Sequence, residues 1–211
     1  MPTWFTRLTG ILYSNGCNGS ATMTDLADIK DAARREAKAR RKAARAAHPE
    51  AAVDAMAVFL EAVSIGAEDI VSAYRPIFSE LDPTPLMAAL HRRGVRLCVP
   101  VITGAAQPLV FRMWTPDTPM EIGAFGAEIP VATPEVIPTI LIAPMLAFDR
   151  SLWRLGYGGG FYDRTLEGLR AAGKARAYGY AYAEQEVSAV PIEPTDQRLD
   201  GITTPDRFLT Q

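Results

Sequence analysis

The pattern of apolar and polar positions predicts two successive helices near the start of the chain. Residues 26–47 are mainly alanine and charged residues, with no glycine or proline, which favours a long helix. Thr24 and Asp25 stand just before it and are good N-cap residues. Residues 50–64 carry apolar side chains every three or four positions, so we expect a second helix there, with Pro49 at its first position.

Beyond residue 65, short apolar runs alternate with helical segments. Strands are predicted over residues 69–74, 95–99, 109–114, 140–143 and 177–182, and helices over residues 85–93 and 161–172. The run 140–143 is apolar throughout, which is typical of a strand at the centre of a sheet. Strand and helix in turn predict an α/β fold in one domain, with a central, largely parallel sheet flanked by helices and a long basic helix before it.

The overall composition is that of a globular protein with one core. Of the 211 residues, 48% are hydrophobic and 22% are charged, which excludes a disordered or disulfide-stapled chain. No apolar run approaches the length of a membrane span, and Cys17 and Cys98 are too few for a disulfide framework. We therefore expect a cytoplasmic protein, monomeric or weakly dimeric, with no membrane partner.

Residues 1–23 differ from the rest of the chain. The stretch 14–20 has the composition of a loop, and the apolar patch before it is too short for the core of a signal peptide. We expect this segment to be disordered, or to be an extension ahead of a true start at Met23. The α/β domain is then predicted to span residues 24–211.

Basic residues are concentrated on the first predicted helix. Residues 30–45 contain eight basic side chains and two acidic ones, whereas the whole chain has a formal charge of −2. Five of these cations follow one stripe at steps of three or four residues: Lys30, Arg34, Lys38, Arg41 and Arg45. The stripe is interpreted in three ways, as a solvated face, as a nucleic-acid contact, or as cations that close over a bound triphosphate. The negative remainder of the chain argues against a general nucleic-acid partner.

The segment 144–164, between the central strand and a predicted helix, has the clearest chemical signal. Four glycines lie within five residues: Gly156, Gly158, Gly159 and Gly160. A glycine-rich turn ahead of a helix exposes backbone N–H groups to a phosphate, and Arg154 adds a guanidinium suited to bidentate phosphate contact. Asp163 falls in the first helical turn, where it either complements the helix dipole or holds Mg²⁺. A turn without a ligand is the alternative, but open α/β sheets bind ligands at the carboxyl ends of their strands, which favours the phosphate site.

Motifs for other catalytic chemistries are absent from the sequence. The glycines do not match the dinucleotide-binding pattern, and there is no HExxH, paired-cysteine or nucleophile-elbow motif. The two histidines, His48 and His91, lie in a turn between helices and on a helix face, and we interpret both as surface residues. A triad hydrolase and a zinc enzyme are therefore not predicted.

The run 147–164 resembles the signature of the 5-formyltetrahydrofolate cyclo-ligase family, which is close to Arg-Leu-Gly-x-Gly-x-Gly-Tyr-Tyr-Asp. The resemblance extends over residues 28–204, with further matches at Lys30, Arg34, Glu80 and Asp196. It implies a fold similar to that of the sugar-isomerase and CoA-transferase group. It also implies the ATP- and Mg²⁺-dependent conversion of 5-formyltetrahydrofolate to 5,10-methenyltetrahydrofolate, with release of ADP and phosphate.

The resemblance also implies a role for each matching residue. ATP would be contacted by Lys30, Arg34, Arg154, Gly156, Gly158, Gly159, Gly160 and Tyr162. The folate would lie along Arg75, Glu80, Tyr157 and Phe161. Mg²⁺ would be held by Asp163 and Asp196, and the catalytic cations would be Arg154 and Lys30. Transfer of a phosphoryl group to the formyl oxygen, followed by ring closure at N10, needs positioning and charge neutralisation rather than a protein nucleophile.

The chain departs from the family pattern at a few positions. Phe161 replaces a tyrosine, the family's Glu-Pro pair appears as Glu128-Ile129-Pro130, Thr195 replaces a histidine, and residues 150–153 fill the turn before Arg154. None of these departures removes a phosphate- or metal-binding residue, so they bear on the substrate contacts. A non-catalytic nucleotide- or nucleic-acid-binding relative on the same scaffold is the alternative. Two carboxylates beside the glycine-rich loop argue against it, since they would repel a nucleic acid.

Overall fold

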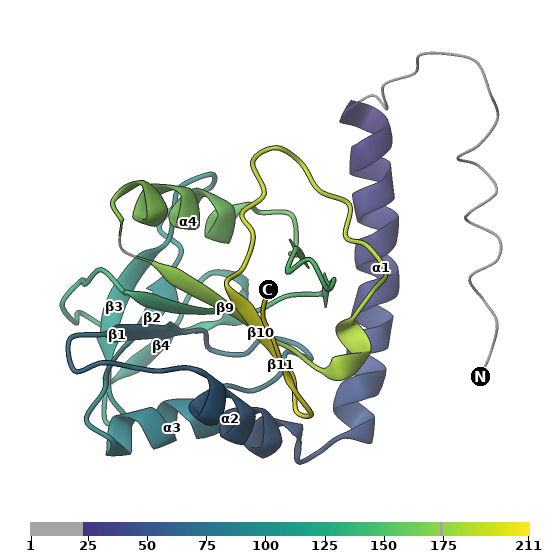
Figure 1. The fold of residues 1–211 in the computed structure, drawn as a ribbon. Helices are drawn as coiled ribbons and strands as arrows, with labels where there is room; N and C mark the ends of the chain where they lie inside the picture. Colours follow the sequence, from purple (N-terminus) through teal and green to yellow (C-terminus); the bar gives the residue numbers. More distant parts are fainter. Residues whose placement is uncertain (1–22, 174) are drawn as a thin grey trace, which may run out of the picture.

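A seven-stranded sheet forms the centre of the computed structural model, which describes residues 23–173 and 175–211 (Figure 1). In spatial order the strands are β11 (Phe208–Leu209), β10 (Gly201–Thr203), β9 (Arg176–Tyr180), β6 (Ile140–Ala143), β1 (Ile70–Ala73), β2 (Arg96–Val101) and β3 (Val110–Trp114). Neighbouring strands from β10 to β2 run parallel, and an antiparallel strand lies at each edge. The predicted largely parallel central sheet is confirmed. The expectation that residues 1–23 are disordered or form an extension lies outside the described residues, apart from Met23, which begins the first helix.

Helices cover both faces of this sheet. They are α1 (Met23–Ala47), α2 (Ala51–Ala62), α3 (Thr84–Arg92) and α4 (Phe161–Ala171). In Figure 1, α2 and α3 lie on one face, α4 lies on the other, and the long α1 stands beside the sheet. No helix in the described part of the chain is long and apolar enough to cross a membrane.

Residues 48–50 form a turn between α1 and α2, and this turn corrects one prediction. Glu50 is the N-cap of α2, and the N–H of Ala51 donates to the carbonyl of His48 at 3.3 Å. Pro49 therefore lies before the helix, and the prediction that it is the first helical residue is wrong. A proline does stand in the first turn of α3, where Pro85 is the second helical residue.

Alternate residues of the central strand pack on opposite faces of the sheet. Ile140 and Ile142 of β6 join the apolar cluster beneath α2 and α3, whereas Leu141 and Ala143 join the cluster beneath α4. All four residues are fully buried. Because side chains of a strand point to the two faces in turn, a strand covered on both sides is apolar at every position.

Two small hairpins and two short 3₁₀ turns complete the fold. The hairpins pair β4 (Met120–Ile122) with β5 (Glu128–Pro130), and β7 (Ala147–Phe148) with β8 (Arg154–Leu155). The turns are η1 (Ala124–Gly126) and η2 (Ala183–Gln185). The sequence analysis predicted none of these elements, nor β10 and β11. The β7–β8 hairpin lies between β6 and the glycine-rich loop, so this loop runs from β8, not from β6, into α4.

Candidate active site

A cavity of about 770 Å³ lies at the carboxyl ends of β1, β2 and β6, where Tyr74, Ile102 and Pro144 directly follow the strands. Its wall also includes α1, η1, the glycine-rich loop, the start of α4 and the C-terminal segment around residue 195. Every residue to which the sequence analysis assigned a role in ATP, folate or Mg²⁺ binding lines this cavity. The structure thus brings the predicted site residues together, while the role of each one stays a prediction.

Helix α1 places Lys30 and Arg34 on the same wall, one turn apart. The Lys30 side chain is buried, and its Nζ lies 2.9 Å from Glu193 Oε2 and 2.8 Å from Asp196 Oδ2. Arg34 donates a hydrogen bond from Nε to the carbonyl of Gly156 at 3.2 Å. The solvated-face interpretation of the basic stripe is therefore wrong for these two residues, which instead face the glycine-rich loop and the acidic C-terminal segment.

Arg154 connects the β7–β8 hairpin to α4 and to the C-terminal segment. Its Nη2 lies 2.8 Å from Asp163 Oδ1, and its Nη1 donates to the carbonyl of Gln197. The N–H of Gln197 donates in turn to Asp163 Oδ1 at 2.9 Å. The buried guanidinium is thus held in place by protein partners on two of its three nitrogens. Its bidentate contact with phosphate stays a prediction.

The two aspartates predicted to hold Mg²⁺ lie on the same side of the cavity. Asp163 receives both of its hydrogen bonds on Oδ1, and Asp196 receives both of its hydrogen bonds on Oδ2. The second oxygen of each carboxylate accepts no hydrogen bond from the described residues. Mg²⁺ favours one or two carboxylates together with phosphate oxygens and waters, so this donor set fits the ion. The described residues contain no cluster of three or more acidic, histidine or cysteine side chains suited to a metal.

Two glycines of the loop adopt backbone conformations that other residues rarely reach. Gly158 has φ +101°, and a Cβ atom at this position would lie 3.2 Å from Cζ of Arg34. Gly160 has φ +63° and is the N-cap residue of α4. The loop can therefore pass close to the Arg34 guanidinium and turn into α4 only because these positions lack a side chain.

The wall of the cavity also includes a buried carboxylate, that of Glu80. Its Oε2 accepts a hydrogen bond from the N–H of Ile77 at 2.9 Å, and its Oε1 accepts one from the Tyr157 hydroxyl at 3.0 Å. Burial raises the pKa of Glu80, against the opposing effects of the Ile77 hydrogen bond, the Arg41 charge and the Tyr157 hydrogen bond. Burial, together with the Glu80 charge, raises the pKa of Tyr157 to about 12, so its hydroxyl remains a donor.

Two exposed phenylalanines at the rim of the cavity were missed by the sequence analysis. Phe78 is 72% exposed with φ +53°, and Phe125 is 67% exposed with φ +57°. The ring of Phe78 lies 6.3 Å from that of Tyr157, and the ring of Phe125 lies 6.4 Å from that of Phe161. Residues with strained backbone of this kind cluster at active sites and ligand-binding sites. Isolated phenylalanines in loops produce no periodic signal, so only the structure reveals this pairing.

Two other predicted residues occupy contrasting environments at the cavity. Arg75 is paired with Glu128, with 2.6 Å between Nη2 and Oε2, so the shifted glutamate of the family's Glu-Pro motif meets a predicted folate contact. The hydroxyl of Tyr162 is buried and has no hydrogen-bond partner among the described residues. Burial raises the pKa of Tyr162, which keeps its proton available to a ligand.

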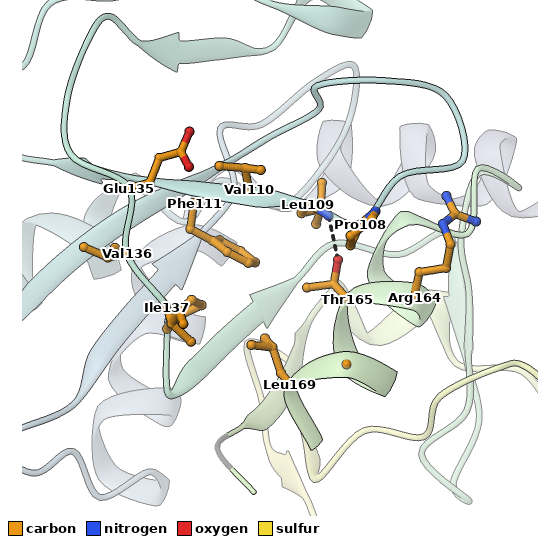
Figure 2. Close-up of a pocket in the computed structure, with 12 residues that line it drawn as sticks. Pro108, Leu109, Val110, Phe111, Glu135, Val136, Ile137, Arg164, Thr165 and Leu169 are labelled. Atoms are coloured by element: carbon orange, nitrogen blue, oxygen red, sulfur yellow. Dashed lines mark hydrogen bonds between the residues drawn. The ribbon is translucent and has the colours of Figure 1, made fainter. Parts of the chain in front are cut away.

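A second, smaller cavity of about 410 Å³ lies between the start of β3 and α4 (Figure 2). Its wall is mostly apolar, with Phe111, Ile137 and Leu169 among its residues. The hydroxyl of Thr165 closes one end by accepting a hydrogen bond from the N–H of Leu109 at 2.8 Å. No predicted site residue lines this cavity, so the predicted chemistry belongs to the larger one.

Fold and site together define an α/β enzyme with a glycine-rich loop, cations and carboxylates gathered at the carboxyl ends of its parallel strands. The sequence model of the 5-formyltetrahydrofolate cyclo-ligase family matches residues 27–205, and the chain belongs to this family. The predictions of this family and of an enzyme of the cyclo-ligase class are thereby confirmed.

Comparison with individual proteins also supports membership of this family. The chain is 34% identical to 5-formyltetrahydrofolate cyclo-ligase of Escherichia coli K12 over 143 residues, which cover 65% of this chain and 78% of that protein. It is 33% identical to the Mycolicibacterium smegmatis enzyme of the same name over 148 residues, covering 65% and 74%. The NMR structure of Aquifex aeolicus 5,10-methenyltetrahydrofolate synthetase has a TM-score of 0.73 at 24% identity, covering 86% of this chain and 92% of that one. This likeness confirms the predicted α/β fold.

Proposed function

We propose that this chain converts 5-formyltetrahydrofolate to 5,10-methenyltetrahydrofolate and consumes ATP in the cavity at the carboxyl ends of its strands. One observation carries the proposal: a set of cations around a glycine-rich loop and a buried carboxylate with aromatic neighbours line the same space. The first set suits a triphosphate, and the second suits a flat ring that carries N–H donors. The proposal includes a cytoplasmic enzyme that acts on small molecules as a monomer or weak dimer.

In the proposed reaction the formyl oxygen attacks the γ-phosphorus of ATP, and the bond from that phosphorus to the ADP oxygen breaks. N10 of the folate then bonds to the activated formyl carbon and loses its proton to water, and the C–O bond breaks so that phosphate leaves. Arg154 and Lys30 neutralise charge on the transferring phosphoryl group, and the backbone of the glycine-rich loop and Arg34 hold the nucleotide. No side chain needs to form a covalent bond with the substrate.

Mg²⁺ bound at Asp163 and Asp196 would supply further neutralisation of the phosphate oxygens. Glu80 orients the pterin by accepting hydrogen bonds from its N–H groups, and Tyr157 holds Glu80 in place, while Phe161 and the rim phenylalanines cover the faces of the ring. This arrangement keeps the formyl group near the γ-phosphate and excludes water from it.

The test is the appearance of the methenyl absorbance band when purified protein meets 5-formyltetrahydrofolate, Mg²⁺ and ATP. We expect the band only when ATP is present, and we expect Arg154→Ala to lower kcat/KM by about 100-fold or more, the effect of removing a group that stabilises transition-state charge. Arg150→Ala is the matched control, because Arg150 lies on the same hairpin with its side chain 81% exposed and outside the cavity. Absence of the band with folded wild-type protein would contradict the proposal.

A further inference from the structure

Arg41 is a buried arginine of α1 to which the sequence analysis gave no role beyond the basic stripe. Only 1% of its surface is exposed, although its side chain carries a permanent charge. Nε donates to the Ser79 hydroxyl at 3.2 Å, Nη1 donates to the carbonyl of Met145 at 3.1 Å, and Nη2 donates to the Tyr157 hydroxyl. Nη1 also lies 3.8 Å from Oε1 of Glu80. Every nitrogen of the guanidinium therefore has a partner.

These contacts join four segments that are distant in sequence. Arg41 belongs to α1, and Ser79 and Glu80 belong to the loop after β1. Met145 lies between β6 and β7, and Tyr157 lies in the glycine-rich loop, 116 residues after Arg41. Both Glu80 and Tyr157 line the cavity, whereas Arg41 does not. Arg41 thus acts on the cavity through its two neighbours.

The direction of the hydrogen bonds follows from the chemistry of the three side chains. A guanidinium can only donate, so the Tyr157 oxygen accepts from Arg41, and its single proton is left for Oε1 of Glu80. The N–H of Ile77 occupies Oε2 from the other side. Glu80 is therefore held by donors on both oxygens, and its remaining lone pairs have a defined direction.

We propose that Arg41 is a positioning residue of the reaction, which keeps Glu80 an ionised acceptor and fixes the Tyr157 hydroxyl against it. The inference rests on the proposed function, because it takes Glu80 and Tyr157 as folate contacts. In this arrangement α1 contributes to both proposed binding sites. Lys30 and Arg34 line the cavity at the proposed phosphate site. Arg41 lies outside the cavity and orients two residues of the proposed folate site, Glu80 and Tyr157.

The charged and titratable groups around Glu80 support this assignment. Arg41 faces it from α1, Tyr157 from the glycine-rich loop, Tyr74 from the end of β1, and Tyr162 from α4. Of these four, Arg41 is the cation, and it opposes the rise that burial causes in the pKa of Glu80. A protonated Glu80 would lose an acceptor for the N–H groups of a pterin ring.

The experiment compares Arg41→Met with wild type in the methenyl absorbance assay. Loss of the hydrogen bonds of a charged group typically costs about tenfold or more, so we expect at least that rise in KM for 5-formyltetrahydrofolate. We expect KM for ATP to change by less than about twofold, because the contacts of Lys30 and Arg34 are kept. The acid limb of the pH profile of kcat/KM for the folate should move to higher pH, since Glu80 then protonates more easily.

Two further variants separate charge from geometry and keep the test informative if Arg41→Met fails to fold. Arg41→Lys keeps the positive charge but cannot make all three hydrogen bonds of the guanidinium. The acid limb of the pH profile should therefore stay near that of wild type, while KM for the folate still rises. Tyr157→Phe removes only the hydroxyl between Arg41 and Glu80, and it should move the acid limb upward. Arg40→Met is the matched control, because Arg40 pairs with Glu36 on the outer side of α1 and should change neither quantity.

The outcomes distinguish this inference from the proposed function. If wild-type protein forms no methenyl product, the proposed function fails, whatever the variants do. If wild type is active and Arg41→Met raises both KM values alike with an unchanged pH profile, then Arg41 only holds α1 in place and the positioning role is overturned. The same conclusion follows if neither Arg41→Lys nor Tyr157→Phe affects the folate parameters.

Discussion

At the scale of the residue, Gly158 determines how the glycine-rich loop and Arg34 fit together. Its φ of +101° is unfavourable for any residue with a Cβ atom, and the space where that atom would lie is taken by the Arg34 guanidinium. Gly156 has an open environment by comparison, with no atom within 4 Å of an added Cβ. Glycine is therefore required more strictly at position 158, where the loop contacts Arg34 of α1, than at position 156.

We predict that Gly158→Ala lowers stability by about 1–2 kcal/mol, the cost of an unfavourable left-handed conformation. It should also raise KM for ATP, because the new methyl group pushes the Arg34 guanidinium away from the loop. Thermal unfolding and the methenyl assay measure the two effects.

Gly168→Ala provides the contrasting glycine substitution. Gly168 lies inside α4, outside the larger cavity, and nothing stands within 4 Å of an added Cβ. Alanine in a helix interior is favoured by about 0.5–1 kcal/mol over glycine, so this variant should be more stable, with unchanged kinetics. Equal stability of the two variants would contradict the role assigned to the Gly158 backbone.

At the scale of the element, helices and strands of four or more residues could be predicted from the sequence, whereas strands of two or three residues could not. The strand β6 and the first residue of α4, Phe161, match the prediction, because an unbroken apolar run and a glycine boundary are local signals. The strands β7 and β8 have two residues each, too few to display a period. They form because Phe148 and Arg154 face each other across a turn that the buried Asp149 carboxylate organises, by accepting from the N–H groups of Ser151 and Trp153.

In the candidate site, too, only the residues with a local sequence signal could be placed from the sequence. Lys30 and Arg34 could be placed together because helical spacing puts them one turn apart. Arg41 belongs to the same stripe, but its proposed role depends on contacts with Met145 and Tyr157, more than 100 residues away in the chain. The assignment of Phe78 to the site likewise depends on its contact with the ring of Tyr157. Contacts of this kind follow from the tertiary fold and leave no periodic trace in the sequence.

Glu186 connects the turn between β7 and β8 to the segment before β11, and it makes the stability of the fold depend on pH. It accepts hydrogen bonds from Arg150, beyond β7, and from Arg207, before β11. The Arg150 hydrogen bond, followed by the Arg207 hydrogen bond and the two positive charges, outweighs burial and holds the pKa of Glu186 below its usual value. A carboxylate with a lowered folded-state pKa contributes stability above its unfolded pKa, and this contribution is lost as the pH falls through the folded-state pKa.

We therefore predict that Glu186→Gln melts at a lower temperature than wild type at pH 7, and that the difference shrinks below about pH 5, near the unfolded pKa of glutamate, and vanishes at lower pH. Thermal unfolding of both proteins between pH 7 and pH 3 measures it. Glu61→Gln is the control, since Glu61 is exposed on α2 and forms no ion pair with the described residues. A difference that stays constant down to pH 3 would show that the ion pairs of Glu186 contribute nothing.

At the scale of the whole molecule, the proposed phosphate site combines segments from near the two ends of the described chain. Lys30 of α1 meets Asp196 of the C-terminal segment across 166 residues of sequence. The glycine-rich loop, before α4, adds a third segment through the hydrogen bond from Arg34 to Gly156. A ligand bound here contacts all three segments at once, so its binding energy opposes unfolding of the entire domain.

We predict that Mg²⁺ and ATP raise the melting temperature of the folded protein. At a ligand concentration of 100 times Kd the added stability is about 2.7 kcal/mol, and for a domain of this size that corresponds to a shift of roughly 5–10 °C. Lys30→Ala should remove most of this shift and keep the shift caused by 5-formyltetrahydrofolate, because Lys30 pairs with Glu193 and Asp196 and not with the proposed folate contacts. Lys42→Ala, on the exposed side of α1, should respond like wild type to both ligands. If Lys30→Ala lost both shifts alike, the two ends of the cavity would not bind separately, and the division of the site into a phosphate half and a folate half would be wrong.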